Sequence, residues 1–441
     1  MLPVYFKELF LFRKMDKEIC LLRSNKQTLY LIKSEDKYKN IKNGESILPL
    51  PEDIRNKKGE DSSDAIYNYA QKLKRKTYSK KLNYQIENLI FLTGAGSSFN
   101  IGSNNRKGML MSGLWDAAVY ILKGEQNMSL FCQKIKYKDK DEHGYIKNLE
   151  KVLSLAERAK EYIQEDLFNI DNEPWNICKV IYEIKKMIKE NCDLRIGSSN
   201  EFTHEIFLNK ITKRKSSLPR VKLFTLNYDT LFEQAARKGN YTVIDGFSFS
   251  IPRIFSGRYF DYDVVIRDKS RIKNEDNFVP RVFHLYKPHG SVDWKRQGNA
   301  ILQDDASKID VNDSLMIFPQ EDKYELSYEQ PFFEMMTRFQ AALRLQNTTL
   351  VTIGFSFGDK HILSMIQEAL EQNPSFQLII INYNKDGISQ NDTFFTEAGE
   401  RGNITIVNEK FQDFVRAYPD VKIYDQTDEY RLIKIANNET L

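Results

Sequence analysis

The feature that most constrains the fold is a series of short apolar stretches in which hydrophobic residues follow one another without alternation. A strand with one face in water alternates apolar and polar residues, whereas a strand covered on both faces does not. We therefore expect a doubly wound, parallel α/β sheet of the Rossmann type with helices on both faces. The strands are predicted at residues 89–93, 221–226, 281–286, 349–355, 377–382 and 403–407.

The remaining residues divide around this sheet. Leu149, Leu153 and Ala156 recur at three- and four-residue steps, as do several isoleucines after residue 176, which predicts amphipathic helices with a small core of their own. A hairpin is expected around Asn25. The predicted domains are an N-terminal extension (1–85), a sheet domain (86–113 and 216–420), a helical insertion (114–215) and a C-terminal tail (421–441).

Charge and cysteine content exclude several classes of protein. The net charge is +4, from 65 basic and 61 acidic residues, so nucleic acid is not excluded but is not required as a partner. The apolar runs are shorter than a membrane span, and we expect a cytoplasmic protein. The four cysteines lie far apart without a C-x-x-C pair, so we expect no zinc or other metal site.

Glycines and polar residues follow each expected strand at its carboxyl end. Because the carboxyl ends of neighbouring parallel strands meet at one edge of a sheet, we expect these residues to line one cleft. A glycine-rich loop leading to a helix start also offers free backbone N–H groups, which bind phosphate. The candidates are Gly94, Ala95, Gly96, Ser97, Ser98, Thr225, Asn227, Asp229, His289, Gly354, Ser356, Asp359 and Asn382.

Four of these stretches, in the order GAGSS, TLNYD, KPHGS and GFSFGD, resemble motifs of the sirtuin (Sir2) family. The matching features are a G-A-G-x-S loop, a T-x-N-x-D segment, a catalytic H-G pair and a late G-x-S turn. The stretch GFSFGDKHI is more similar to sirtuin-like proteins of bacterial antiphage defence than to deacylases. The four-cysteine zinc module and the P-D-F-R type segment of the deacylases are both missing.

The resemblance implies a sirtuin-type fold and an enzyme that hydrolyses NAD, as substrate, to nicotinamide and ADP-ribose. In such systems NAD is depleted when phage infection is sensed. The resemblance also implies control by homo-oligomerisation or by a partner, such as the HerA-like hexameric ATPase of Sir2–HerA systems.

The chemistry assigns a role to each candidate. Breaking the nicotinamide–ribose bond leaves oxocarbenium-like charge on the ribose. Asn227 can hold ribose hydroxyls and orient water, and His289 can take a proton. Asp229 can orient its loop or stabilise the positive charge. We expect residues 94–98 to contact the pyrophosphate and Ser356 and Asp359 to contact the adenosine ribose. Asn382 is expected on the adenine side.

Each candidate also has a structural explanation. Asn227 could cap a helix beginning at Thr230, Asp359 could cap one beginning at Lys360, and His289 could be a turn residue. The alternative functions are an NAD-dependent protein deacylase and a catalytically silent scaffold that binds NAD or ADP-ribose. A nuclease would have only basic patches to support it. A classical oxidoreductase is disfavoured because Phe99 stands where the third glycine of G-x-G-x-x-G belongs.

Overall fold

A computed structural model describes residues 16–83, 86–103, 106–142, 144–163, 167–197, 202–215, 217–266, 277–317 and 329–420. The chain divides into two compact units, and each is described by itself. The larger unit comprises Leu82–Asn382 with Lys410–Leu441, and the smaller comprises Met1–Lys81 with Tyr383–Glu409. The expected division placed residues 383–409 in the sheet domain, whereas in the structure they group with the N-terminal residues.

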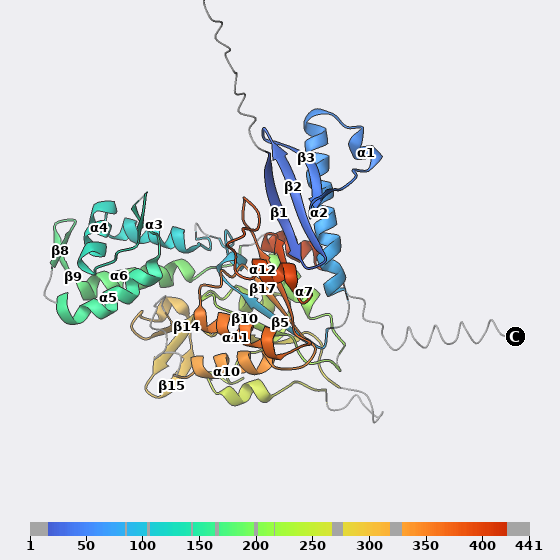
Figure 1. Cartoon of the computed structure of the whole chain (residues 1–441). Helices are drawn as coiled ribbons and strands as arrows, with labels where there is room; N and C mark the ends of the chain where they lie inside the picture. Colours follow the sequence, from blue (N-terminus) through green and yellow to red (C-terminus); the bar gives the residue numbers. More distant parts are fainter. Residues whose placement is uncertain are drawn as a thin grey trace, which may run out of the picture. The chain divides into compact units, whose positions relative to one another are not determined.

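The larger unit is built on a parallel sheet, which confirms the predicted α/β fold (Figure 1). The strand order is β11-β13-β10-β5-β17-β18, and the printed pairings between neighbours are all parallel. The strands are β5 (Asn88–Thr93), β10 (Lys222–Thr225), β11 (Thr242–Ile244), β13 (Val282–Tyr286), β17 (Thr348–Ile353) and β18 (Gln377–Asn382).

Helices cover both faces of this sheet. In the register of β10 and β5, Phe224 lies opposite Leu92, so Phe224 and Phe91 point to opposite faces. The ring of Phe224 packs edge-on against Phe339 of α10 (Phe332–Leu343), with centroids 4.9 Å apart. The ring of Phe91 packs at 5.0 Å against Phe207 of α7 (Thr203–Ile211). The uninterrupted apolar strands of the sequence are therefore explained by burial on two sides.

The order of the strands defines a topological switch point beside β5. After β5 the chain builds β10 and β13 on one side of it, and then returns to build β17 and β18 on the other. In open α/β sheets, ligands bind outside the carboxyl ends of the strands at such a point. The helix α8 (Leu231–Lys238) follows β10, and α11 (Lys360–Gln372) follows β17. The helix α13 (Phe411–Ala417) also belongs to this unit.

The expected helical insertion contains four helices that pack side by side, α3, α4, α5 and α6 (Figure 1). They share one core, which also takes in Val292, Ala306, Val311 and Met316 from the later part of the chain, so this core is not confined to the insertion. The fifth helix, α7, packs instead on α8 and α13. The four helices are α3 (Met111–Ile121), α4 (Glu125–Lys134), α5 (Leu149–Ile163) and α6 (Ile177–Cys192).

Short antiparallel strands accompany these elements. Two hairpins pair β6 with β7 and β8 with β9, and a small sheet has the order β12-β15-β14-β16. These strands are β6 (Lys140–Asp141), β7 (Gly144–Tyr145), β8 (Leu167–Ile170), β9 (Glu173–Asn176), β12 (Arg253–Ile254), β14 (Gly290–Gln297), β15 (Ala300–Gln303) and β16 (Ser314–Met316). Short 3₁₀ helices are η1 (Ala95–Ser97), η2 (Gly257–Asp261) and η3 (Ala306–Lys308).

The smaller unit is an antiparallel sheet with helices. The hairpin predicted around Asn25 joins β1 to β2, and β1 also pairs antiparallel with the late strand β19. In this unit Glu409 is buried and accepts from both Arg75 and Tyr78 of α2. Its elements are β1 (Lys17–Ser24), β2 (Gln27–Ser34), β3 (Lys37–Asn43), β4 (Ser46–Ile47), α1 (Glu52–Arg55), α2 (Gly59–Leu82), α12 (Phe395–Glu400) and β19 (Ile404–Asn408).

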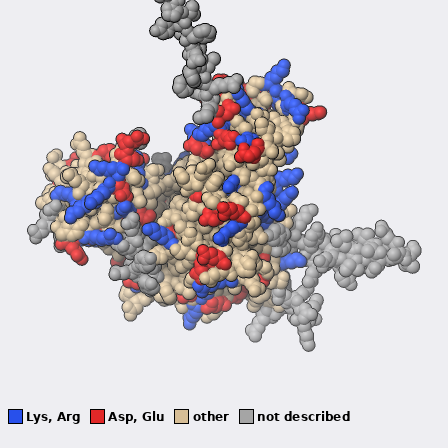
Figure 2. Space-filling model, in the orientation of Figure 1, with Lys and Arg blue, Asp and Glu red and all other residues tan. Residues whose placement is uncertain are grey.

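Basic and acidic side chains are interspersed over the face drawn in Figure 2. Among the described residues, none of the helices combines the length and the apolar character that crossing a membrane requires.

Candidate functional site

The glycine-rich loop follows β5 and forms a single 3₁₀ turn, η1, rather than the start of an α-helix. Four of its backbone N–H groups are used within the protein. Those of Gly94 and Gly96 donate to carbonyl groups at the end of β17, and those of Ser97 and Ser98 donate within the turn. The expected row of free N–H donors is therefore not formed, because the loop uses them to join β5 to β17.

Three glycines make this junction possible. A Cβ atom on Gly96 would lie 2.6 Å from the Cα atom of Gly354, and one on Gly94 would lie 2.7 Å from the carbonyl oxygen of Gly354. Gly354 itself has a φ of +60°, a conformation that side chains disfavour. The ends of β5 and β17, which flank the switch point, thus meet backbone to backbone.

Asn227 lies against this loop and is half-buried. Its Nδ2 atom donates toward the carbonyl oxygen of Gly94 at 3.0 Å and the hydroxyls of Ser97 and Ser98 at 3.1 and 2.8 Å. Within the described part of the chain, no hydrogen bond to its Oδ1 atom is found. The amide is thus held by its donor end, and its acceptor end remains for a hydroxyl or a water.

Asp229 is buried beside the same serine. Its Oδ2 atom accepts from Ser98 at 2.7 Å, and its Oδ1 atom accepts the N–H of Leu231, the first residue of α8. Burial raises the pKa of the Asp229 carboxyl, and the Lys287 ammonium opposes this rise. It is therefore Asp229, and not Asn227, that binds the start of this helix.

His289 and Asp359 form a hydrogen-bonded pair. His289 Nε2 lies 3.0 Å from Asp359 Oδ2, and only 11% and 6% of the two side chains are exposed. The other oxygen of Asp359 accepts the N–H groups of His361 and Ile362 at the start of α11. Asp359 therefore caps its helix, the structural explanation considered above, and also fixes the imidazole.

The remaining candidates lie near these groups. Thr225 Oγ1 accepts the N–H of Asn227 at 3.2 Å. Asn382 makes two hydrogen bonds to the backbone of Phe355. Its Nδ2 atom donates to the carbonyl oxygen of Phe355, and its Oδ1 atom accepts from the N–H of Phe355. The amide expected to face adenine is thus engaged in fixing the turn after β17. Ser356, in the same turn, is exposed.

The segments that carry Asn227 and His289 are joined directly. The N–H of Val292 and the hydroxyl of Ser291 donate to the carbonyl oxygen of Tyr228 at 3.0 and 3.2 Å. This places the loops after β10 and β13 side by side, as their adjacent strands require. The structure therefore brings the amide, imidazole and glycine-loop segments to one edge of the sheet.

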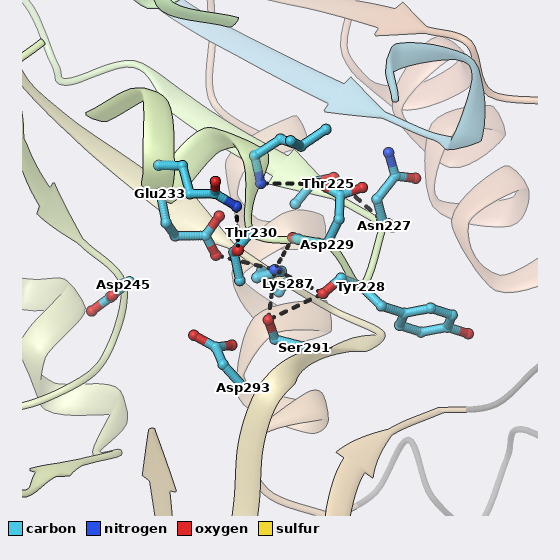
Figure 3. A network of polar contacts seen from close by, with 12 residues as sticks. Thr225, Asn227, Tyr228, Asp229, Thr230, Glu233, Asp245, Lys287, Ser291 and Asp293 are labelled. Carbon is cyan, nitrogen blue, oxygen red and sulfur yellow. Dashed lines mark hydrogen bonds and ion pairs between the residues drawn. The ribbon is translucent and has the colours of Figure 1, made fainter. Parts of the chain in front are cut away.

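Sequence reasoning missed Lys287, the residue directly after β13. Its ammonium group is buried and donates to the carbonyl oxygen of Asp229, to Ser291 and to Glu233 (Figure 3). The available signal was a lysine between a largely apolar strand and a Pro-His-Gly turn, a setting in which a charged side chain needs a buried partner.

A cavity of about 630 Å³ lies next to this network. Glu233 and Thr230 of α8 line it together with Asp245 and Asp293, whereas Asn227 and His289 do not belong to its lining. Burial raises the pKa of Glu233 to about 7, although the Lys287 ammonium acts in the opposite direction. In the described ranges, no group of three His, Cys, Asp or Glu side chains is placed to hold a metal ion.

A family comparison matches part of the chain. Residues 221–412 match the family model of the SIR2-like domain, which is fewer than half of the 441 residues. The matched segment contains Asn227, Asp229, His289, Asp359 and Asn382, and it begins after the glycine-rich loop. No curated protein matches the chain.

Three solved structures show distant likenesses. A Sir2 enzyme is 12% identical with a TM-score of 0.37, covering 78% of this chain and 95% of its own. Sir2 bound to an acetylated peptide is 14% identical with a TM-score of 0.34, covering 78% and 96%. Cytosolic 5′-nucleotidase IIIB bound to cytidine is 9% identical with a TM-score of 0.27, covering 82% and 93%. These likenesses are too weak to carry an argument about chemistry.

Proposed function

We propose that this protein hydrolyses the nicotinamide–ribose bond of NAD, releasing nicotinamide and ADP-ribose. The observation that carries the proposal is the pairing of His289 with Asp359 next to the segment that holds Asn227. A general base fixed by a carboxylate and an amide with an available acceptor suit the addition of water to a ribose carbon. The SIR2-like match over residues 221–412 supports NAD as the substrate.

The reaction can be assigned to the side chains of this edge. Nicotinamide leaves with the electrons of its bond to the ribose, and water adds to the cationic carbon. His289, whose imidazole is fixed by Asp359, would take a proton from a ribose hydroxyl or from the water. Oδ1 of Asn227 would orient that hydroxyl or water, and Asp229 holds Ser98 in the loop beside it.

The dinucleotide would lie across the switch point. We propose that residues 94–98 contact the pyrophosphate, with Ala95 as the loop residue whose N–H has no partner in the described part of the chain. Gly354 and the exposed Ser356 would lie on the adenosine side, and Thr225 and Asn382 would hold the neighbouring backbone in place.

The test is to incubate the purified protein with NAD and to follow nicotinamide release by chromatography. Asn227→Ala and His289→Ala should each lower kcat by about 100-fold or more, because each removes a group that acts on the reacting atoms. Asn391→Ala, at an exposed asparagine of the smaller unit, is the matched control and should leave turnover unchanged. Full turnover in both site variants would contradict the proposal.

Two further measurements distinguish the alternative functions from NAD hydrolysis. Consumption of NAD only in the presence of an acetylated peptide would identify an NAD-dependent deacylase. Binding of NAD or ADP-ribose without turnover would identify a silent scaffold.

We also propose that the reaction serves antiphage defence by depleting NAD, and that self-assembly or a HerA-like hexameric ATPase gates it. The support is the resemblance of GFSFGDKHI to such proteins. Size-exclusion chromatography with and without the candidate ATPase, coupled to the NAD assay, tests this. A monomer with full activity in its absence would contradict it.

A further inference from the structure

The buried ammonium group of Lys287 connects the two loops that carry the candidate catalytic residues. Lys287 directly follows β13, and only 2% of its side chain is exposed. Nζ donates to the carbonyl oxygen of Asp229 at 2.5 Å, to Ser291 Oγ at 2.7 Å and to Glu233 Oε1 at 3.0 Å. All three of its N–H donors therefore have acceptors, as a buried ammonium requires.

The positions of these acceptors are informative. Asp229 lies two residues after Asn227, and Ser291 lies two residues after His289. Figure 3 shows Lys287 in the middle of this network, with its contacts to Tyr228, Asp229, Ser291 and Glu233. One side chain thus ties the backbone that carries the amide to the backbone that carries the imidazole.

Glu233 provides the countercharge. It lies on α8, its side chain is 15% exposed, and its Oε1 atom accepts from Lys287. Its Oε2 atom is buried without a hydrogen-bond partner in the described part of the chain. An ion pair with such a deficit is a weak source of stability, since desolvation offsets much of the attraction. The arrangement is better explained by what the ammonium holds than by the stability of the pair.

We propose that Lys287 is a positioning residue that sets the geometry between Asn227 and His289, an inference that rests on the proposed NAD hydrolysis. Lys287 has no place in the reaction itself, because all three of its N–H donors are used within the protein. Its effect is to hold the water-orienting amide and the base at one fixed separation. Small displacements of such groups cost about 100-fold in rate.

The experiment compares Lys287→Met, Glu233→Gln and the double variant Lys287→Met/Glu233→Gln. The single Lys287→Met variant leaves a buried carboxylate without its ammonium, so it can fail to fold. The double variant replaces both charges with neutral side chains of similar size, so it leaves no unpaired buried charge and should fold, with a melting temperature lowered by the acceptors that lose their donor. Glu233→Gln alone retains an acceptor for Lys287 and should retain turnover.

The double variant separates positioning from stability. We expect kcat for nicotinamide release to fall about 100-fold with KM nearly unchanged, and hydrogen exchange to rise in peptides covering residues 226–231 and 288–292. A folded double variant with full kcat would overturn the inference. If the unchanged protein releases no nicotinamide, the proposed function fails by itself. Hydrogen exchange then still tests the positioning role of Lys287, because equal exchange rates of these peptides in the unchanged protein and the double variant would overturn it.

Discussion

Nε2 of His289 lies 3.0 Å from Oδ2 of Asp359, and the second oxygen of this carboxylate caps α11. One aspartate therefore fixes both the start of a helix and the orientation of an imidazole. The helix ties the carboxylate to the part of the sheet beyond β17, while the imidazole belongs to the loop after β13. The pair consequently connects strand ends from the two sides of the switch point.

The two roles of Asp359 can be separated by substitution. Asp359→Asn retains an oxygen that accepts the N–H groups of α11 but removes the negative charge beside His289, so kcat for NAD hydrolysis should fall about 100-fold while the melting temperature changes little. Asp359→Ala should lose about 1 kcal/mol of stability as well, because the cap is gone. Steady-state kinetics and thermal melting measure the two effects, and full turnover of Asp359→Asn would contradict the role in catalysis.

The backbone contact at Gly354 predicts a loss of both stability and binding. In Gly354→Ala the new Cβ would lie 2.5 Å from the Cα of Gly96 at a φ of +60°, so the free energy of unfolding should fall by about 2 kcal/mol or more. Gly402→Ala is the matched control, since a Cβ there meets nothing within 4 Å. Thermal melting and NAD titration of both variants test this, and equal melting temperatures would refute it.

A substitution at Asn382 tests whether its amide holds the backbone or contacts a ligand. Asn382→Asp places a carboxylate oxygen against the carbonyl of Phe355, where Nδ2 now donates at 2.7 Å. We expect the free energy of unfolding to fall by about 1–3 kcal/mol, because a buried acceptor loses its donor. A variant with unchanged stability but a raised KM for NAD would show instead that the amide faces the adenine, as the sequence predicted.

His204 makes the larger unit sensitive to acid. Its ring lies among Phe202, Phe232 and Phe411, and neither nitrogen has a hydrogen-bond partner among the described residues. Burial lowers the pKa of His204 from 6.5 to about 3. Between these two pKa values the imidazole is protonated in the unfolded chain but neutral in the folded protein. The free energy of unfolding therefore falls as the pH drops from 6.5 to about 3.

The variant His204→Leu should remove this part of the acid sensitivity. We expect it to melt at a higher temperature than the unchanged protein at about pH 5, with a smaller difference at about pH 8, where the imidazole is neutral in both states. The same pair of proteins at about pH 8 is the control. A difference that is equal at the two pH values would show that packing, and not protonation, is responsible.

The strands were predictable because burial on both faces leaves a local signal. Short, largely apolar stretches located β5, β10, β13, β17 and β18 to within two residues of their observed ends. The short strands β6 to β9 carry no such signal, since two to four residues do not establish a period. The strand that pairs with β19 could not be predicted from the sequence either. Its antiparallel partner is β1, where Leu22 lies opposite Val407, and no local pattern indicates a pairing between residues so far apart in the chain.

The location of the candidate residues at strand ends was predictable, whereas their contacts were less so. Strand ends identified Asn227, His289 and Asp359, because adjacent parallel strands bring their carboxyl ends together. The contact between His289 and Asp359 depends on the path of the β17–α11 turn, and the sequence assigned Asp359 to a ribose instead. Lys287 was missed because its three acceptors come together only in the folded chain.

The close approach of Gly94 and Gly96 to Gly354 limits how this protein can be redesigned. No side chain fits between the two strand ends, so substitution of these three glycines cannot reshape this part of the sheet edge without displacing the backbone. Substitutions intended to change what this edge binds would have to be made at surrounding residues, such as the exposed Ser356. Mutant libraries that leave the three glycines unchanged should contain the largest share of folded proteins.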